Sequence, residues 1–221
     1  EFVKVYKDDL FHVPESVSFK EAAMVESFAV AVRALKISNI PENQKILIIG
    51  GGNIGLTTLN VLLAKRKPNY VLVIEPHDYL REKAIKIGAT DALQPSKAKI
   101  RKFFKKNNGA PDYIFDCVGN EQTMIMAIDF IRGGGKIVLE GVYRGNISFP
   151  ISMMLLKEIG LQGIWGHDRD DIIAAIDLVA QKKVNPNELI SNIIPLKEIQ
   201  SGFEEYLKPG ERKFVKTLVK I

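Results

Sequence analysis

A Gly-Gly-Gly-Asn-Ile-Gly segment at residues 50–55 is the part of the sequence whose residue types and spacing most clearly indicate chemistry. It directly follows the aliphatic run 46–49 and opens a helix-length segment. A pyrophosphate needs bare peptide N–H groups and the positive end of a helix close to it. Gly50 would allow the tight turn, Gly52 the close approach of phosphates, and Gly55 the packing of helix on strand. The predicted contacts to the dinucleotide come from Gly50, Gly52, Asn53, Ile54 and Gly55.

A carboxylate follows at the distance that such a site requires. Glu75 ends the apolar run 70–74 and lies 20 residues beyond Gly55. From there it can accept hydrogen bonds from both hydroxyls of the adenosine ribose. Its negative charge would repel a 2'-phosphate, which favours NAD over NADP as the cofactor. His77 and Arg81 are near enough in sequence to offset part of that charge.

The glycines allow two other interpretations. Gly50 and Gly55 also have the spacing of a P-loop, but Leu56 occupies the position of the phosphate-binding lysine, which argues against nucleoside triphosphate hydrolysis. A plain strand-to-helix turn is the second alternative. It does not explain three glycines, because each glycine adds conformational entropy that folding must remove.

The elements that position this turn alternate between short apolar runs and helix-length segments. We expect strands at residues 45–49, 70–74, 92–93, 113–117, 137–139 and 161–165. Helices are expected at residues 54–65, 79–87, 97–106 and 121–130. Repeated βαβ units of this kind predict an α/β fold with a doubly wound, parallel six-stranded sheet, the Rossmann fold.

Both ends of the chain have a different pattern. The Ser18-Phe19-Lys20-Glu21 segment has the spacing of a capping box and predicts a helix start. Alternating apolar residues at positions 2, 3 and 5 suggest that the chain begins within a strand, and we expect the natural polypeptide to begin earlier. After residue 165 the sequence predicts, in order, a helix over 172–179, a strand over 190–194, a helix over 198–207 and a strand over 214–221.

Composition excludes several classes of protein. Apolar residues make up 46% and charged residues 26% of the 221 residues, and no apolar run is long enough to span a bilayer.

Cys117 is the only cysteine, which excludes an internal disulfide or an all-thiolate metal site. The lack of further cysteines and of an export signal favours a cytoplasmic protein. We expect Cys117 to fill apolar space. The lysine-rich segment 97–106 predicts one solvated helix face, so neither nucleic acid nor membrane is an expected partner.

Several further segments carry a family resemblance. They are Phe11-His12-Val13-Pro14-Glu15, residues 46–55, Asp116-Cys117-Val118-Gly119-Asn120, Gly133-Gly134-Gly135-Lys136-Ile137-Val138-Leu139-Glu140-Gly141 and Phe214-Val215-Lys216-Thr217-Leu218. Together they resemble the medium-chain dehydrogenase/reductase family, in particular its zinc-dependent polyol, sorbitol and threonine dehydrogenase branch. The resemblance extends over essentially the whole chain.

This resemblance implies a metal-binding role for one residue. Residues 24–31 look like the segment that carries the third catalytic zinc ligand, and Glu26 matches the glutamate of the polyol branch. Without the resemblance, Glu26 would be an ordinary carboxylate on a helix surface. The family's other zinc ligands lie in an N-terminal lobe, so we expect zinc only in the complete protein. The remaining histidines, which are His12, His77 and His167, show no ligand spacing.

The resemblance also implies further contacts to the cofactor. Lys216 occupies the position of a basic residue that contacts the pyrophosphate, with an ordinary exposed strand lysine as the alternative. Val118-Gly119 and Gly141-Val142 look like the loops that enclose adenine and nicotinamide at the carboxyl ends of the strands.

We therefore predict the NAD(H)-binding portion of a zinc-dependent dehydrogenase that transfers hydride between a secondary alcohol or polyol and NAD. Residues 27–165 would form the binding domain, and residues 1–26 and 166–221 would be parts of the catalytic lobe. No catalytic residue is assigned to the chain, which alone is expected to be inactive. A homo-oligomer is expected through the edge strand 161–165. The alternatives are a non-catalytic dinucleotide-binding module and a zinc-free NADPH-dependent reductase.

Overall fold

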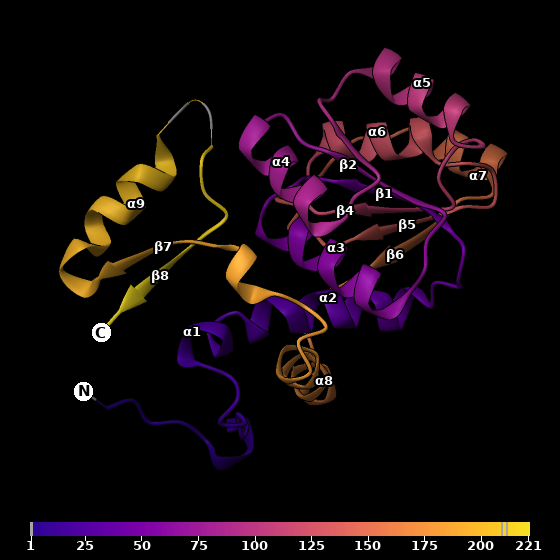
Figure 1. The fold of residues 1–221 in the computed structure, drawn as a ribbon. Coiled ribbons are helices and arrows are strands. Elements are labelled where there is room, and N and C mark those ends of the chain that lie inside the picture. The colour runs from indigo at the N-terminus through magenta and orange to yellow at the C-terminus, as the bar shows by residue number, and fades with distance from the viewer. Residues whose placement is uncertain (1, 209, 211) are drawn as a thin grey trace.

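The computed structural model describes residues 2–208, 210 and 212–221. These residues form a parallel six-stranded sheet between layers of helices, and a separate two-stranded sheet (Figure 1). The large sheet consists of β1 (Lys45–Ile49), β2 (Tyr70–Ile74), β3 (Asp91–Leu93), β4 (Tyr113–Asp116), β5 (Lys136–Leu139) and β6 (Gly160–Gly163). Its strand order is β3-β2-β1-β4-β5-β6, so the direction of winding reverses between β1 and β4. The predicted doubly wound α/β fold is confirmed.

Helices cover both faces of the sheet, and alternate residues of β1, β2, β4 and β5 enter two separate cores. Ile46 and Ile48 of β1 belong to one core, and Leu47 and Ile49 belong to the other. The first core includes residues of α2 (Val25–Ser38), α3 (Asn53–Lys65), α4 (Asp78–Ile87) and α8 (Arg169–Ala180). The second includes residues of α5 (Lys97–Lys106) and α6 (Glu121–Phe130). Strands that are buried on both faces require the continuous aliphatic runs seen in the sequence.

The lysine-rich helix α5 is amphipathic, as predicted. Ile100, Phe103 and Phe104 are buried, and the cations of this helix are exposed. Phe103 packs against Tyr70 of β2 with the ring centroids 5.1 Å apart, edge to face. Aromatic packing in this geometry holds α5 on the sheet and leaves its charges in solvent.

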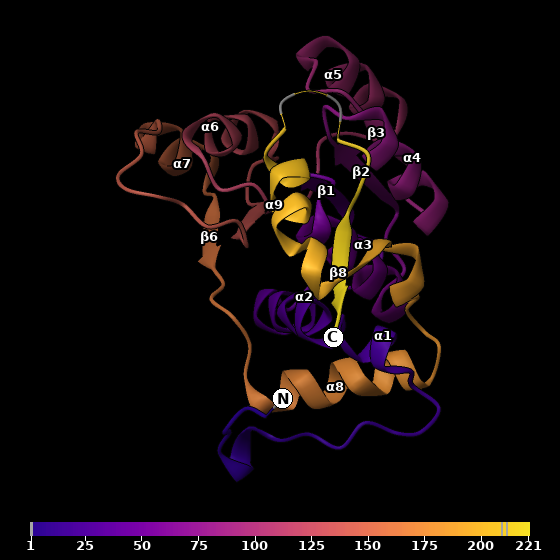
Figure 2. The same cartoon turned by 90° about the vertical axis from the view of Figure 1, so that its left-hand side faces the viewer.

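The chain ends leave the large sheet and meet beside it (Figure 2). The short helix α1 (Phe19–Ala22) starts with the predicted capping box, in which Ser18 and Glu21 exchange hydrogen bonds. Helix α8 packs on α2. Beyond it, β7 (Ile190–Pro195) and β8 (Lys216–Lys220) form the two-stranded parallel sheet, connected by α9 (Ile199–Leu207). The remaining elements of the described chain are single turns of 3-10 helix, which are η1 (Lys7–Asp9), η2 (Pro186–Glu188) and η3 (Leu196–Glu198).

Two expectations from the sequence were wrong, and one helix was missed. Residues 2–6 form no strand, and Phe2 and Val3 are exposed without a strand to pair with. Strand β6 ends at Gly163, so Trp165 lies in the following loop. The helix α7 (Ile151–Lys157) was not predicted, because its apolar residues lack helical periodicity; only Met154 packs against the core.

No helix in the described part of the chain combines the length and the apolar character that crossing a bilayer requires.

Candidate cofactor-binding site

The glycine-rich turn joins the carboxyl end of β1 to the N-terminus of α3. Gly50 has a φ of +99°, which L-residues rarely adopt. Gly55 lies so close to the turn that a Cβ atom there would be 1.8 Å from the Gly50 carbonyl oxygen. At Gly52, in contrast, a Cβ would meet no atom within 4 Å, so this side of the turn faces open space. Gly50 therefore allows the sharp bend, Gly55 the close contact between helix and strand, and Gly52 open access to the turn.

Four consecutive amides of this turn are available to a ligand. The first amide to donate within α3 is that of Leu56, to the Gly52 carbonyl at 2.9 Å. Among the described residues, no acceptor is found for the N–H groups of Gly52, Asn53, Ile54 and Gly55. Unpaired amides at the positive end of a helix dipole form an anion site, so the turn can hold a pyrophosphate.

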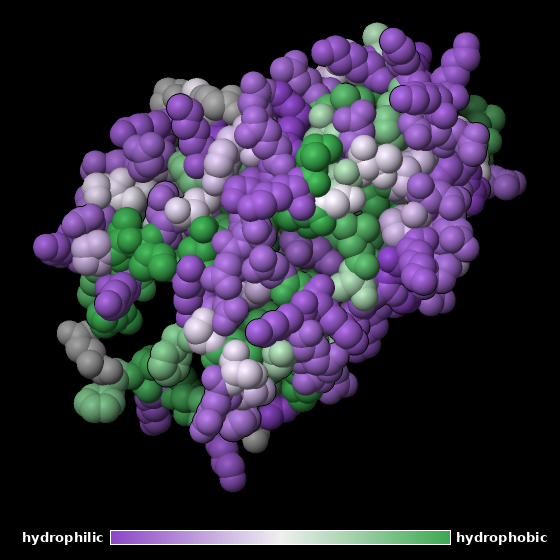
Figure 3. Space-filling view, in the orientation of Figure 1, coloured by the Kyte–Doolittle hydropathy of each residue, from purple (hydrophilic) through white to green (hydrophobic). Residues whose placement is uncertain are grey.

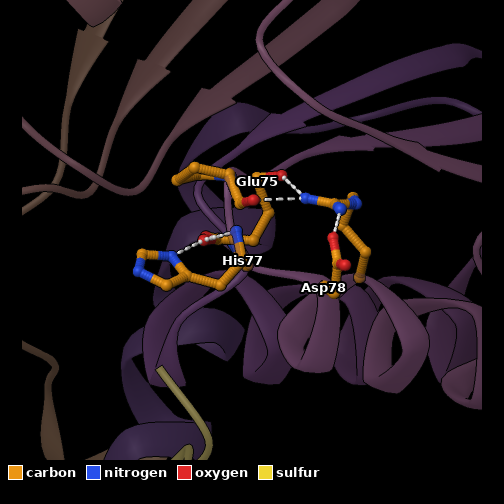
Figure 4. A network of polar contacts seen from close by, with 6 residues as sticks. Glu75, His77 and Asp78 are labelled. Carbon is orange, nitrogen blue, oxygen red and sulfur yellow. Dashed lines mark hydrogen bonds and ion pairs between the residues drawn. The ribbon is translucent and has the colours of Figure 1, made fainter. Parts of the chain in front are cut away.

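Glu75 lies against the same turn, at the carboxyl end of β2 (Figure 4). Its side chain is nearly buried, and its Oε2 atom accepts a hydrogen bond of 2.8 Å from the Gly51 amide. Its Oε1 atom accepts from the amide of His77 at 3.0 Å and lies 2.6 Å from the His77 Nδ1 atom. A carboxylate offers about four acceptor positions. Three of these positions are occupied, by the Gly51 amide, the His77 amide and the His77 ring, whereas a ribose diol needs two. Movement of the partly exposed His77 ring would free the second one.

Arg81 does not offer a free cation to this site. Its guanidinium donates to the main-chain carbonyls of Glu75 at 2.7 Å and Pro76 at 2.5 Å, and it pairs with Asp78 (Figure 4). These contacts hold the loop after β2 in place. The positive charge that the sequence placed near Glu75 is therefore paired within the loop.

The loops after β4 and β5 lie directly against each other. A Cβ on Gly119 would be 2.6 Å from the Gly141 carbonyl carbon, and one on Gly141 would be 2.4 Å from the Gly119 nitrogen. Asp116 fixes both loops, because one carboxylate oxygen accepts from the amides of Val118 and Gly119 at 3.0 and 3.2 Å. The other oxygen accepts from the Tyr143 hydroxyl at 2.5 Å. The loop residues Val118-Gly119 and Gly141-Val142, named from the sequence, are thus brought together at the carboxyl edge of the sheet.

Behind these loops lies a buried acid whose role the sequence did not reveal. Glu140 follows β5 and is 8% exposed; one of its oxygens accepts from the Thr58 hydroxyl of α3 at 2.7 Å and lies 3.7 Å from the Cys117 sulfur. The other oxygen has no partner among the described residues. Burial raises the pKa of Glu140 to about 8, and the nearby Asp116 charge adds to this effect.

Glu140 and the Cys117 thiol are therefore largely uncharged at neutral pH. Burial and then the Glu140 charge raise the pKa of the Cys117 thiol well above its usual value, which agrees with its predicted role as apolar filling. A signal for Glu140 was present: like Glu75, it is an acid that directly follows an aliphatic strand.

Glu26 lies near the N-terminus of α2, and its side chain is 65% exposed. Its two oxygens are 3.9 Å from the His167 Nε2 atom and 3.4 Å from the Ser27 hydroxyl, which accepts in turn from the Asn53 amide at 3.0 Å. Among the described residues, no three His, Cys, Asp or Glu side chains form a group that could hold a metal. These residues alone do not fit zinc, since one carboxylate cannot hold the ion.

Lys216 is the first residue of β8 and is half-buried. Its amide donates to the Leu189 carbonyl at 3.1 Å. Its ammonium makes no hydrogen bond or ion pair with any residue that the structure describes. The cation is available to a ligand, although no contact joins it to the glycine-rich turn.

Comparison with known proteins identifies the family of this fold. Residues 54–181, more than half of the chain, match the family of zinc-binding dehydrogenases. The chain belongs to the zinc-binding dehydrogenase family. It is 31% identical to D-xylulose reductase A of Aspergillus oryzae over 220 residues, which cover 96% of this chain and 60% of the relative. It is 30% identical to D-xylulose reductase of Saccharomyces cerevisiae over 210 residues, which cover 92% and 59%.

Solved structures agree with this assignment. The 2R,3R-butanediol dehydrogenase of Bacillus subtilis is 26% identical, with a TM-score of 0.85 over 96% of this chain and 60% of that one. An Escherichia coli short chain alcohol dehydrogenase in complex with NADH is 22% identical, with a TM-score of 0.90 over 98% and 64%. The chain spans about 60% of the length of the curated relatives it matches. The resemblance to zinc-dependent polyol dehydrogenases is confirmed.

Proposed function

We propose that this chain binds NAD(H) and is the cofactor-binding portion of a zinc-dependent dehydrogenase that acts on a secondary alcohol or polyol. The observation that carries the proposal is the set of four unpaired amides at residues 52–55 beside the buried carboxylate of Glu75. Relatives named D-xylulose reductase and butanediol dehydrogenase support the substrate class. The bound nicotinamide would accept or donate the hydride.

In this proposal each part of the site binds one part of the dinucleotide. The amides of Gly52, Asn53, Ile54 and Gly55, with the Gly50 bend behind them, hold the pyrophosphate, and Lys216 adds a positive charge. Glu75 accepts from the adenosine ribose. The paired loops 118–119 and 141–142 hold the bases in place and exclude water from them. These residues orient the cofactor and leave the chemistry to the nicotinamide ring.

NADH is expected to bind at least roughly tenfold more tightly than NADPH, because Glu75 repels a 2'-phosphate and Arg81 is already paired. Isothermal titration of the chain with each cofactor measures the ratio. The Glu75→Gln variant should reduce it, and Glu82→Gln, at an exposed acid without a partner in the described structure, should not. Tighter binding of NADPH to the wild-type chain would contradict the role of Glu75.

We further propose that residues 27–165 form the binding domain and that residues 1–26 and 166–221 belong to the catalytic lobe. Apolar side chains gather over β7, β8, α9 and the N-terminal segment (Figure 3). Phe2, Phe203 and Leu207 are among the exposed residues there. The remainder of the lobe, which the relatives' greater length indicates, would cover this surface.

Glu26 would contribute one zinc ligand within that complete lobe, together with residues outside this chain. The zinc content of the complete protein, measured by atomic emission after dialysis, is expected to fall severalfold in Glu26→Ala. A Glu15→Ala variant, which removes an exposed acid elsewhere in the chain, should keep its zinc. Equal zinc content in both variants would remove Glu26 from the metal site.

A homo-oligomer is part of the same proposal. Strand β6 lies at the edge of the large sheet, and Leu155, Leu156 and Leu161 are exposed beside or on it. An unpaired, partly apolar strand edge can pair with the same edge of a second copy.

A further inference from the structure

Helix α5 carries six lysine and arginine residues and no acidic residue. Two of the six, Lys97 and Arg101, pair with Asp129 at 3.2 and 3.1 Å. The other four are exposed and form no hydrogen bond or ion pair with any residue that the structure describes. These four residues are Lys99, Lys102, Lys105 and Lys106. Because no carboxylate pairs with them, their combined field attracts anions.

Three of the four unpaired lysines border a groove between α5 and β3, which lie next to each other (Figure 2). Lys99, Lys102 and Lys106 are three and four residues apart, so they share one face of the helix. They extend over about 10 Å along its axis. The groove has a volume of about 320 Å³, and Lys105 does not border it. Strand β3 is the outer strand of the described sheet, and β2 separates it from β1 and the glycine-rich turn.

Polar groups without positive charge border the same groove. Asp91 accepts a hydrogen bond of 2.8 Å from the Ala92 amide with its Oδ1 atom, and its Oδ2 atom has no partner among the described residues. The side-chain nitrogen of Asn107 donates to the Phe103 carbonyl at 2.9 Å, which leaves the side-chain oxygen as an acceptor. A carboxylate repels a simple anion, whereas it binds hydroxyl groups strongly. The groove therefore suits a ligand that carries both anionic groups and hydroxyls.

We propose that this groove binds a phosphorylated sugar or polyol. The ammonium groups of the three lysines contact its phosphates. Asp91 and Asn107 accept hydrogen bonds from its hydroxyls, and the edges of Leu93 and Phe103 contact its carbon chain. The length of the lysine row favours a ligand with a phosphate at each end. This site lies outside the cofactor site and takes no part in hydride transfer.

Fructose 1,6-bisphosphate is the probe for this site. Fructose lacks the phosphates, and hexane-1,6-diol bisphosphate has both phosphates but no hydroxyls. Calorimetry of the wild-type chain at low ionic strength is expected to show the sugar bisphosphate binding at least roughly fivefold more tightly than either. Lys102→Gln should weaken its binding by about five- to tenfold, because a charge-assisted hydrogen bond is lost. The matched variant Lys105→Gln removes the same charge from the same helix outside the groove and should change the affinity by less than about twofold.

Asp91→Asn separates recognition of hydroxyls from attraction between charges. The variant keeps an oxygen for the Ala92 amide and removes the negative charge. Affinity for fructose 1,6-bisphosphate is expected to fall about threefold, whereas affinity for hexane-1,6-diol bisphosphate should rise because a repulsion is removed. Opposite changes for the two ligands follow only if Asp91 binds the sugar.

Four results would overturn the proposal. The first is that the wild-type chain does not bind fructose 1,6-bisphosphate. The second is an equal loss in Lys102→Gln and Lys105→Gln, which would show general attraction to a basic surface. The third is tighter binding of the sugar bisphosphate to Asp91→Asn. The fourth is displacement of the sugar bisphosphate by saturating NAD, which would place it at the glycine-rich turn.

Discussion

Replacement of Gly52 by leucine is expected to abolish dinucleotide binding while the chain unfolds as cooperatively as before. Gly52 has an ordinary φ of −76°, and a side chain there would meet no protein atom near its Cβ. The added side chain would instead occupy the space in front of the free amides. The loss of hydrogen bonds to a charged phosphate should lower NADH affinity by at least roughly a hundredfold.

Gly55 provides the matched control for this prediction. Its Cβ would be 1.8 Å from the Gly50 carbonyl oxygen, so Gly55→Ala must displace α3 from β1. That variant is expected to lose about 1–3 kcal/mol of stability in urea unfolding as well as cofactor binding. Unchanged NADH affinity in Gly52→Leu would show that the phosphates do not bind at this turn. A large loss of stability in Gly52→Leu would show that protein atoms, and not solvent, surround the side-chain position of Gly52.

The stability of the folded chain is expected to fall as pH rises towards 8, because of Glu140. The folded chain holds the Glu140 proton up to a pKa of about 8, whereas the unfolded chain releases it near 4.5. The resulting stabilisation is complete below pH 4.5 and is lost as pH rises through 8. The shift corresponds to on the order of 5 kcal/mol. Urea unfolding between pH 5 and pH 8.5 should therefore show the wild-type chain losing stability, and Glu140→Gln losing much less.

Other groups around Glu140 should not produce this slope. Burial raises the pKa of Cys117 above its already alkaline ordinary value, so the thiol stays neutral across this range. Glu82→Gln, at an exposed acid, should keep the wild-type slope. Parallel stability curves for Glu140→Gln and the wild-type chain would mean that Glu140 is ionised in the folded protein.

The sequence was most informative where one local pattern determines both structure and chemistry. Strands β1 and β2 were predicted because both faces are buried, which requires an unbroken aliphatic run. Glu75 was identifiable because the distance from the glycine turn to the end of the next strand follows from the length of one helix. The structure places Glu75 directly against Gly51.

Features that depend on contacts between distant residues were not predictable. Glu140 meets Thr58 and Cys117 only after β4, β5 and α3 are packed together. Helix α7 is a run of apolar residues with no polar face, so periodicity could not identify it. Trp165 was expected to be in a strand, and the structure places it exposed in the loop after β6.

The central claim is that bare peptide N–H groups at the N-terminus of α3 receive the pyrophosphate. Amide NMR shifts of the isotope-labelled chain, recorded during titration with NAD, test it directly. We expect the largest changes at Gly52, Asn53, Ile54 and Gly55, and the same changes with ADP-ribose. Unperturbed signals from these four amides at saturating NAD would contradict the account, whatever other residues respond.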